Sequence, residues 1–349
     1  AAAALAFSDY VGYFFPAVKH SSGIALGQGP FQFHFGGAQL LASSLILVFT
    51  LLNFFGVRRI ARVQNALTAM KILVLVAFIV AGFIAGSGNL NHFSQPATRT
   101  SLTPIAAQFA FSLVFIYVGY SGWNAAAYVA EELRNPERTL PLALALGTML
   151  VAALYVGLNM VFIYGVPLEQ MKGTLAVGSL AAMHLFGPEV AGVFSALMAL
   201  SLVSTVSAMI IIGPRVYYAM AKNRAFFAGA AKVHPRWHTP VNAIIAQGLC
   251  AMIMTVTRFT DLFFFIGITL NFFAVMSVSS LLIFRRRAGW QKLRVVNFMF
   301  PLIPAFFIVA GLCVTLFGVL LNPTWSAVAV VIVTAGALLY HFRLRSRLQ

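Results

Sequence analysis

The sequence predicts an all-α protein that crosses a membrane many times. Of its 349 residues, 61% are hydrophobic and 9% are charged, and the mean hydropathy is +0.91. Ordinary soluble domains have about 25% charged residues, so this chain has too few to cover a soluble surface. The apolar residues also fall in runs of about 20, the length that an α-helix needs to cross the hydrocarbon core of a bilayer.

The apolar runs predict nine full spans and one partial helix. The partial helix is expected at residues 1–16, and it is followed by a Gly- and Ser-rich loop, Lys19–His34. A second loop is expected to reach about Leu180. The predicted spans are Phe35–Val57, Val63–Gly86, Pro104–Leu133, Leu140–Pro167, Ala181–Tyr218, Pro240–Thr257, Asp261–Phe284, Phe298–Leu321 and Pro323–Phe342.

The basic residues predict the orientation of these spans. The net charge of +16 invites a nucleic-acid partner, but the 23 Lys and Arg residues stand in short clusters between apolar runs. With the nine spans, the loops on one side hold 18 of them and those on the other side hold 4. Cytoplasmic loops of membrane proteins carry this excess. We therefore expect a cytoplasmic C-terminus, a basic tail at 343–349 and no nucleic-acid partner.

Several kinds of chemistry lack any motif in the sequence. Cys250 and Cys313 both fall in apolar runs, so no disulfide framework is predicted. The His residues have no metal-ligand spacing, and no nucleophile–base pair or phosphate-binding loop is found. We expect no catalysis, no metal and no cofactor. The chain opens in the middle of an apolar run, so we also expect that it lacks the segments that precede Ala1.

The most informative stretch is Phe115–Pro136, because a membrane-length helix is interrupted there. Gly119 and Gly122 flank a Tyr-Ser pair, and each Gly weakens a helix interior by roughly 1 kcal/mol relative to Ala. Non-helical backbone at membrane depth is tolerated where it lines a cavity, and such breaks mark the binding sites of transporters. The alternative is a pair of small residues at a helix crossing. The stretch by itself favours neither.

Lys71 is the basic residue that lies well inside a predicted span. An ionisable residue there costs at least ~2.5 kcal/mol and indicates a function by default. The alternative is a side chain that reaches back to the interface, but Lys71 is about nine residues, or roughly 13 Å, from the Arg62 end. Ser201, Ser204, Thr205 and Ser207 are candidate partners for a cation on one long helix. Taken singly, each hydroxyl is better explained by a bond to its own helix backbone.

These residues together resemble the amino acid–polyamine–organocation superfamily, and within it the bacterial permeases of the L-type transporter kind. The resemblance covers nearly the whole chain, and its motifs are specific for the superfamily and weak for the substrate. The sixth helix of the family resembles Tyr120–Asn124 followed by Glu131-Glu132, Asn135-Pro136 and Leu140-Pro141. Further similar stretches are Leu52–Val57 with Val63–Asn65 and Thr68–Lys71, Arg215–Ala221, and Val233–Arg236 with Thr239-Pro240.

The resemblance implies a LeuT-type inverted-repeat fold without its first two helices. The remainder of the first repeat would be residues 1–86, the second repeat 104–285, and two C-terminal helices 298–342. The family holds the substrate amine on carbonyls of the sixth-helix break, which correspond to Val118, Gly119 and Ser121, while the carboxylate site lies on the missing first helix. Lys71 matches a lysine that replaces a sodium ion in sodium-independent members, with Ser204 and Thr205 beside it.

We therefore predict a sodium-independent transporter of neutral amino acids in a bacterial inner membrane, working by exchange or proton coupling. Its small-molecule amino acid substrate and membrane lipid are the expected partners, and a partner subunit is left open. The alternatives are a polyamine or cationic amino acid transporter and a membrane fragment that binds amino acids without transporting them. The predicted substrate-binding residues are Val118, Gly119, Tyr120, Ser121, Gly122, Trp123 and Asn124.

Overall fold

The computed structural model describes the chain except residues 28–31, 56–59, 100–101, 129, 131–132, 238, 291–296, 298 and 345–349. The chain forms two compact units. One comprises Ala1–Thr100, Leu150–Phe259 and Arg343–Gln349, and the other comprises Ser101–Met149 and Thr260–Phe342. Helix α6 (Pro136–Gly165) passes from the second unit into the first.

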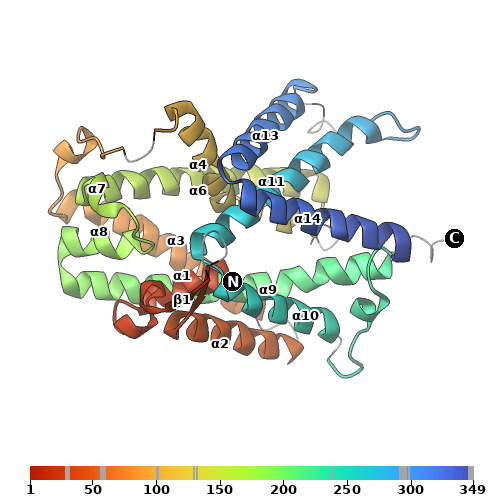
Figure 1. The fold of residues 1–349 in the computed structure, drawn as a ribbon, viewed down its shortest axis with the longest axis horizontal. Helices are drawn as coiled ribbons and strands as arrows, with labels where there is room; N and C mark the ends of the chain where they lie inside the picture. Colours follow the sequence, from red (N-terminus) through yellow and green to blue (C-terminus); the bar gives the residue numbers. More distant parts are fainter. Residues whose placement is uncertain are drawn as a thin grey trace. The chain divides into compact units, whose positions relative to one another are not determined.

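The first unit is a helical bundle with a small hairpin. In Figure 1, α1, α2, α9 and α10 of this unit lie against one another. Its strands β1 (Ile24–Leu26) and β2 (Phe33–Phe35) pair antiparallel, with Ala25 opposite His34. Its other helices are α1 (Ala2–Val11), α2 (Gly37–Leu52), α3 (Ile60–Ala85), α7 (Leu168–Met171), α8 (Val177–Phe186), α9 (Pro188–Lys222) and α10 (Val241–Ile253). Short 3-10 turns cover Pro16–Val18, His20–Ser22, Asn53–Phe55, Leu90–Phe93, Ala228–Ala231 and Met254–Val256.

The core of the first unit forms around Phe78 of α3. This ring lies 4.3 Å from the ring of Phe194 in α9 and 6.1 Å from that of Phe186 in α8, centroid to centroid. Val161 and Leu185 are almost completely buried in the same cluster. The cluster therefore joins α3, α6, α8 and α9 by apolar contact, which fixes α3 against α9.

The second unit contains the interrupted helix. It consists of α4 (Ile105–Gly119), α5 (Ala125–Tyr128), the first half of α6, α11 (Phe259–Phe284), α13 (Leu302–Leu321), α14 (Pro323–Leu339) and a π-helical turn, Tyr340–Leu344. Helix α13 packs on both α4 and α14. The core of the second unit joins α4, α11 and α14. It is formed by the buried side chains of Val114, Phe264, Ile268 and Ala329.

Six helices of the described residues are long and apolar enough to cross a membrane. They are α3 (from Gln64), α6, α9, α11, α13 and α14 with its extension to Phe342. The predicted spans Phe35–Val57, Pro104–Leu133 and Pro240–Thr257 instead contain α2, α4 and α10, which are 16, 15 and 13 residues long. Each of these three continues into a 3-10 turn or a break. The prediction of an all-α protein that spans the membrane many times is confirmed. Of the nine predicted spans, six are single helices of membrane length in the described residues.

One predicted boundary is wrong. The sequence suggested a loop up to about Leu180 and one helix over Ala181–Tyr218. Helix α8 begins at Val177, and the chain breaks at Gly187 before α9 begins at Pro188. Gly187 has a φ of +87°, which favours glycine, and Pro188 suits the first turn of the new helix because it needs no backbone N–H there.

Candidate functional site

The break predicted in the interrupted helix is present. Helix α4 ends at Gly119, and the next helix, α5, begins at Ala125. Gly122 adopts a φ of +98°, and a Cβ atom built on it would meet no atom within 4 Å. The backbone conformation, rather than lack of room, therefore selects glycine at this position. The structure places Val118, Gly119, Tyr120, Ser121, Gly122, Trp123 and Asn124 together at this break.

Side chain and backbone of Ser121 close the end of α4. The Ser121 backbone N–H donates to the Val118 carbonyl at 3.0 Å, and the Ser121 Oγ donates to the same oxygen at 2.7 Å. A carbonyl oxygen has two lone pairs, so these two bonds use both. The indole of Trp123 is 44% exposed within the chain, so it presents a large apolar surface beside the break.

Helix α11 lies unusually close to the end of α4. A Cβ atom on Gly267 would come within 2.8 Å of the Val114 carbonyl oxygen and 2.9 Å of Val118 Cγ2. The absence of a side chain at Gly267 therefore allows the two helices to approach at the residue that precedes the break. The stacked rings of Phe111 in α4 and Phe264 in α11 add to this contact, with their centroids 5.5 Å apart.

The first unit brings Lys71 to one of its two predicted partners. Lys71 Nζ donates to Thr205 Oγ1 at 3.0 Å, and this hydroxyl donates in turn to the Ser201 carbonyl at 3.2 Å. Ser204 is fully buried, and its partner is a residue that the sequence analysis did not assign to the site. Gln64 Nε2 donates to Ser204 Oγ at 2.8 Å and lies 3.2 Å from the Ser204 carbonyl.

Gln64 could have been found from its spacing. It precedes Lys71 by seven residues, which is about two helical turns and places both side chains on one face of α3. The two side chains reach consecutive residues of α9. The hydroxyl of Ser201, one turn earlier on α9, is buried with no hydrogen-bond partner in the described residues. Helices α3 and α9 thus share a polar cluster of Gln64, Lys71, Ser201, Ser204 and Thr205 inside the first unit.

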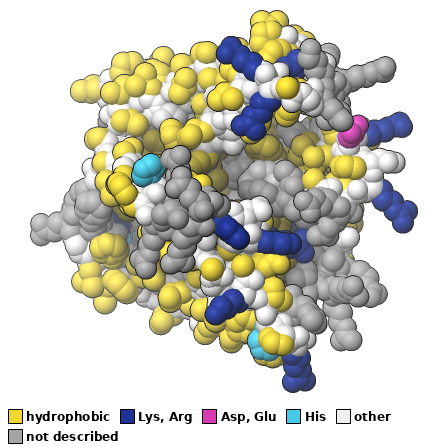
Figure 2. Space-filling model, turned by 90° about the vertical axis from the view of Figure 1, so that its right-hand side faces the viewer, with side chains coloured by type: hydrophobic (Ala, Val, Ile, Leu, Met, Phe, Trp, Pro, Cys, Tyr) yellow, Lys and Arg dark blue, Asp and Glu magenta, His cyan; other side chains and the backbone are white. Residues whose placement is uncertain are grey.

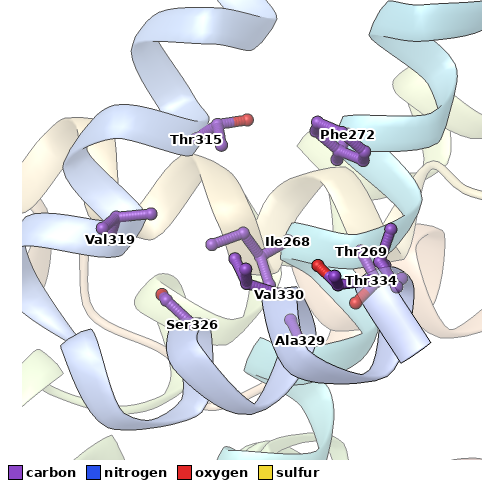
Figure 3. Close-up of a pocket in the computed structure, with 10 residues that line it drawn as sticks. Ile268, Thr269, Phe272, Thr315, Val319, Ser326, Ala329, Val330 and Thr334 are labelled. Atoms are coloured by element: carbon purple, nitrogen blue, oxygen red, sulfur yellow. The ribbon is translucent and has the colours of Figure 1, made fainter. Parts of the chain in front are cut away.

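A cavity of about 180 Å³ in the second unit contains none of the predicted site residues. It lies between α11, α13 and α14, and Figure 3 shows Phe272, Thr315 and Ser326 around it. Its walls are mainly apolar, and the Thr269 hydroxyl in one wall is buried without a partner in the described residues. A space of this kind suits an apolar group and not a zwitterion. The described residues also contain no group of three or more His, Cys, Asp or Glu that could hold a metal.

The interrupted apolar helix and the half-buried Lys71 suggest a membrane permease, and comparison with known proteins decides the family. The sequence profile of a family described as amino acid permease matches residues 2–338. The chain belongs to the amino acid permease family. It is therefore an integral membrane protein, in keeping with its six long apolar helices.

Three relatives of this permease illustrate the similarity. The b(0,+)-type amino acid transporter 1 of Mus musculus is 27% identical over 314 residues, which cover 87% of this chain and 62% of that protein. The large neutral amino acids transporter small subunit 2 of Oryctolagus cuniculus is 27% identical over 279 residues, covering 76% of this chain and 50% of that protein. The serine/threonine exchanger SteT of Bacillus subtilis is 26% identical over 335 residues, which cover 93% of this chain and 75% of that protein. The chain thus spans between half and two thirds of the two animal relatives' length.

Proposed function

We propose that this permease carries neutral amino acids across a membrane by alternating access, as an exchanger that does not need sodium. The observation that carries the proposal is the break at Gly119–Asn124 in a chain of the amino acid permease family. Similar proteins are named as transporters of amino acids, and one is named as an exchanger of serine and threonine. No covalent step is required, so the protein works as a carrier and not as an enzyme.

The solute binds against the broken backbone. Its ammonium group donates hydrogen bonds to carbonyl oxygens at the end of α4, and Tyr120 and Trp123 form part of the pocket wall. The Val118 carbonyl already accepts two bonds from Ser121. Binding there therefore requires Ser121 to release at least one of them. A net hydrogen bond is worth about 0.5–1.5 kcal/mol, which an ammonium-to-carbonyl bond can replace.

Lys71 acts as a fixed cation between α3 and α9. Its bond to Thr205 joins the two helices at a place where a sodium-dependent carrier would hold an ion. Gln64 supports this arrangement, because it occupies Ser204 and leaves Thr205 to the lysine. The alternative use of Lys71 is as a proton carrier coupled to the solute.

We place the protein in a bacterial inner membrane with a cytoplasmic C-terminus. This placement rests on the distribution of the basic residues and on the similarity to the SteT protein of Bacillus subtilis. We also propose the inverted-repeat organisation, with repeats at 1–86 and 104–285 and two further helices at 298–342.

Exchange in proteoliposomes tests the function. The protein as the cell makes it is reconstituted without sodium, and uptake of labelled serine, threonine or leucine is compared between vesicles preloaded with the same amino acid and empty vesicles. Uptake should depend on preloading. Binding without flux would favour the non-transporting alternative, and uptake of a polyamine instead would favour the other carrier class.

Lys71→Ala tests the second part of the proposal. We expect exchange to fall at least tenfold while insertion into the membrane is retained. Lys172→Ala is the matched control, since Lys172 is exposed and pairs only with Glu169 and Thr98 on the surface in the described residues. Equal exchange in the Lys71 variant and the wild type, with the same pH dependence, would remove Lys71 from the mechanism.

A further inference from the structure

Three consecutive arginines, Arg285–Arg287, follow the last residue of α11. This helix is a membrane-length segment of 26 residues, and the next such segment, α13, begins at Leu302. The arginines therefore lie where the chain leaves the membrane. Arg286 and Arg287 are exposed. Among the described residues, neither has a carboxylate within ion-pair distance. Figure 2 shows how lysine and arginine side chains stand out from apolar ones on one face of the molecule.

Arg285 has a structural role that leaves its neighbours available. Its guanidinium lies 3.8 Å from the centroid of the Phe300 ring, and its Nη2 donates to Asn297 Oδ1 at 2.7 Å. Arg285 therefore joins the end of α11 to the residues that precede α13. This contact fixes the backbone from which Arg286 and Arg287 extend.

The turn after α11 folds an indole back toward the arginines. The Trp290 backbone N–H donates to the Arg287 carbonyl at 3.3 Å, and the Gly289 φ of +84° permits the reversal. The Trp290 ring then stacks on Phe284 with centroids 6.2 Å apart and planes 19° apart. The Arg287 guanidinium lies 4.7 Å from the centroid of the same Phe284 ring. The Arg287 guanidinium and the Trp290 indole therefore both contact the Phe284 ring.

The indole nitrogen of Trp290 has an unused donor. Its Nε1 is buried and has no hydrogen-bond partner in the described part of the chain. A buried indole N–H usually has an acceptor. An indole at the end of a membrane span is also placed at the depth where lipid headgroups lie. A headgroup oxygen that reached this N–H would supply the missing acceptor.

We propose that Arg286, Arg287 and Trp290 form a binding site for the phosphodiester of an anionic phospholipid. Guanidinium groups match phosphate oxygens with paired N–H donors, and the negative surface of the inner leaflet attracts basic segments of this kind. Lipid is favoured over a soluble phosphate because Leu282 and Ile283, just before the arginines, are 40% and 64% exposed. Their side chains offer apolar contact to the acyl chains of the same molecule. The proposal rests on the membrane orientation proposed above and does not depend on the transport function.

Native mass spectrometry of the detergent-purified protein tests the site. Phosphatidylglycerol is titrated against phosphatidylcholine with the same acyl chains. The variant Arg286→Gln/Arg287→Gln should bind phosphatidylglycerol at least tenfold more weakly than the wild type. The control Lys222→Gln/Arg224→Gln removes two positive charges from exposed positions at the end of α9, and its affinity should change less than twofold.

Trp290→Phe separates a built site from general charge attraction. It keeps every charge and an aromatic ring at the position that stacks on Phe284, and removes the N–H donor together with the pyrrole part of the indole. We expect phosphatidylglycerol affinity to fall about threefold or more, with phosphatidylcholine binding unchanged. Equal losses in the two charge-neutralising variants, no effect of Trp290→Phe, or full displacement of phosphatidylglycerol by millimolar inorganic phosphate would each overturn the proposal.

Discussion

Gly267→Ala should damage the permease through the contact between α11 and α4. The added Cβ would lie 2.8 Å from Val114 Cγ1, 2.8 Å from the Val114 carbonyl oxygen and 2.9 Å from Val118 Cγ2. Carbon atoms in van der Waals contact are about 3.5–4.0 Å apart, so the helices must separate by roughly 0.5–1 Å. The carbonyl oxygen is part of the backbone and cannot rotate away. Overpacking of this kind costs about 1–3 kcal/mol.

The cost should appear in two measurements. The Tm of the purified protein should fall by roughly 2–12 °C, taking about 2–4 °C per kcal/mol for a large domain. Equilibrium binding of a labelled neutral amino acid should weaken, because Val118 directly precedes the break and moves with the end of α4. The additional change Val118→Ala relieves the contact with Cγ2 and should recover part of the affinity, while the contact with the Val114 oxygen remains.

Gly147→Ala is the matched control. Gly147 lies inside α6, and a Cβ there would meet no atom within 4 Å. This variant should be as stable as the wild type or more stable by up to about 1 kcal/mol, because Ala favours a helix over Gly. If Gly267→Ala matched it in Tm and in affinity, the close approach of α11 would not support the site.

Two further predictions concern stability and pH. Thr269→Val replaces a buried hydroxyl that has no partner in the described residues, so Tm should rise by the equivalent of about 1–3 kcal/mol. Thr315→Val should lower Tm, because Thr315 Oγ1 accepts a hydrogen bond from Asn271 and donates one to the Gly311 carbonyl. A result with the signs reversed would contradict the assignment of the Thr269 hydroxyl. The exposed Glu169 accepts from Lys172 and from the Thr98 backbone, and these bonds lower its pKa below the usual value of 4.5. The carboxylate tether is therefore present above pH 4.5 and is lost as the pH falls through the lowered pKa. The protection factor for amide exchange at Thr98 should fall only in that acidic range, and it should be low at all pH values in Glu169→Ala.

The sequence predicted the break and the lysine because both violate a strong rule. Glycines and a serine interrupt an apolar run, and a charge lies in another, so each stands out from its surroundings. In the structure Lys71 donates to Thr205, one of the two residues expected beside it. The role of these residues in transport stays a prediction.

The break at Gly187 could have been predicted, because the Gly187-Pro188 pair is a turn signal and the sequence analysis did not use it. The other features that the sequence did not reveal depend on three-dimensional packing. The double occupancy of the Val118 carbonyl depends on how Ser121 turns back, which no pattern of residue types specifies. The approach of Gly267 to Val114 joins residues 153 positions apart in the chain, so it could not be read from local sequence.

The most direct test of the central claim is the affinity of Gly122→Ala for a labelled neutral amino acid. Gly122 and Gly173 both have positive φ values, +98° and +74°, and neither has an atom within 4 Å of a built Cβ. Alanine therefore imposes a backbone cost of roughly 1–3 kcal/mol at each site, with no steric contact. If the break binds the solute, the affinity of Gly122→Ala should fall about tenfold while Gly173→Ala binds like the wild type. Equal affinity in all three proteins would contradict a binding site at the break.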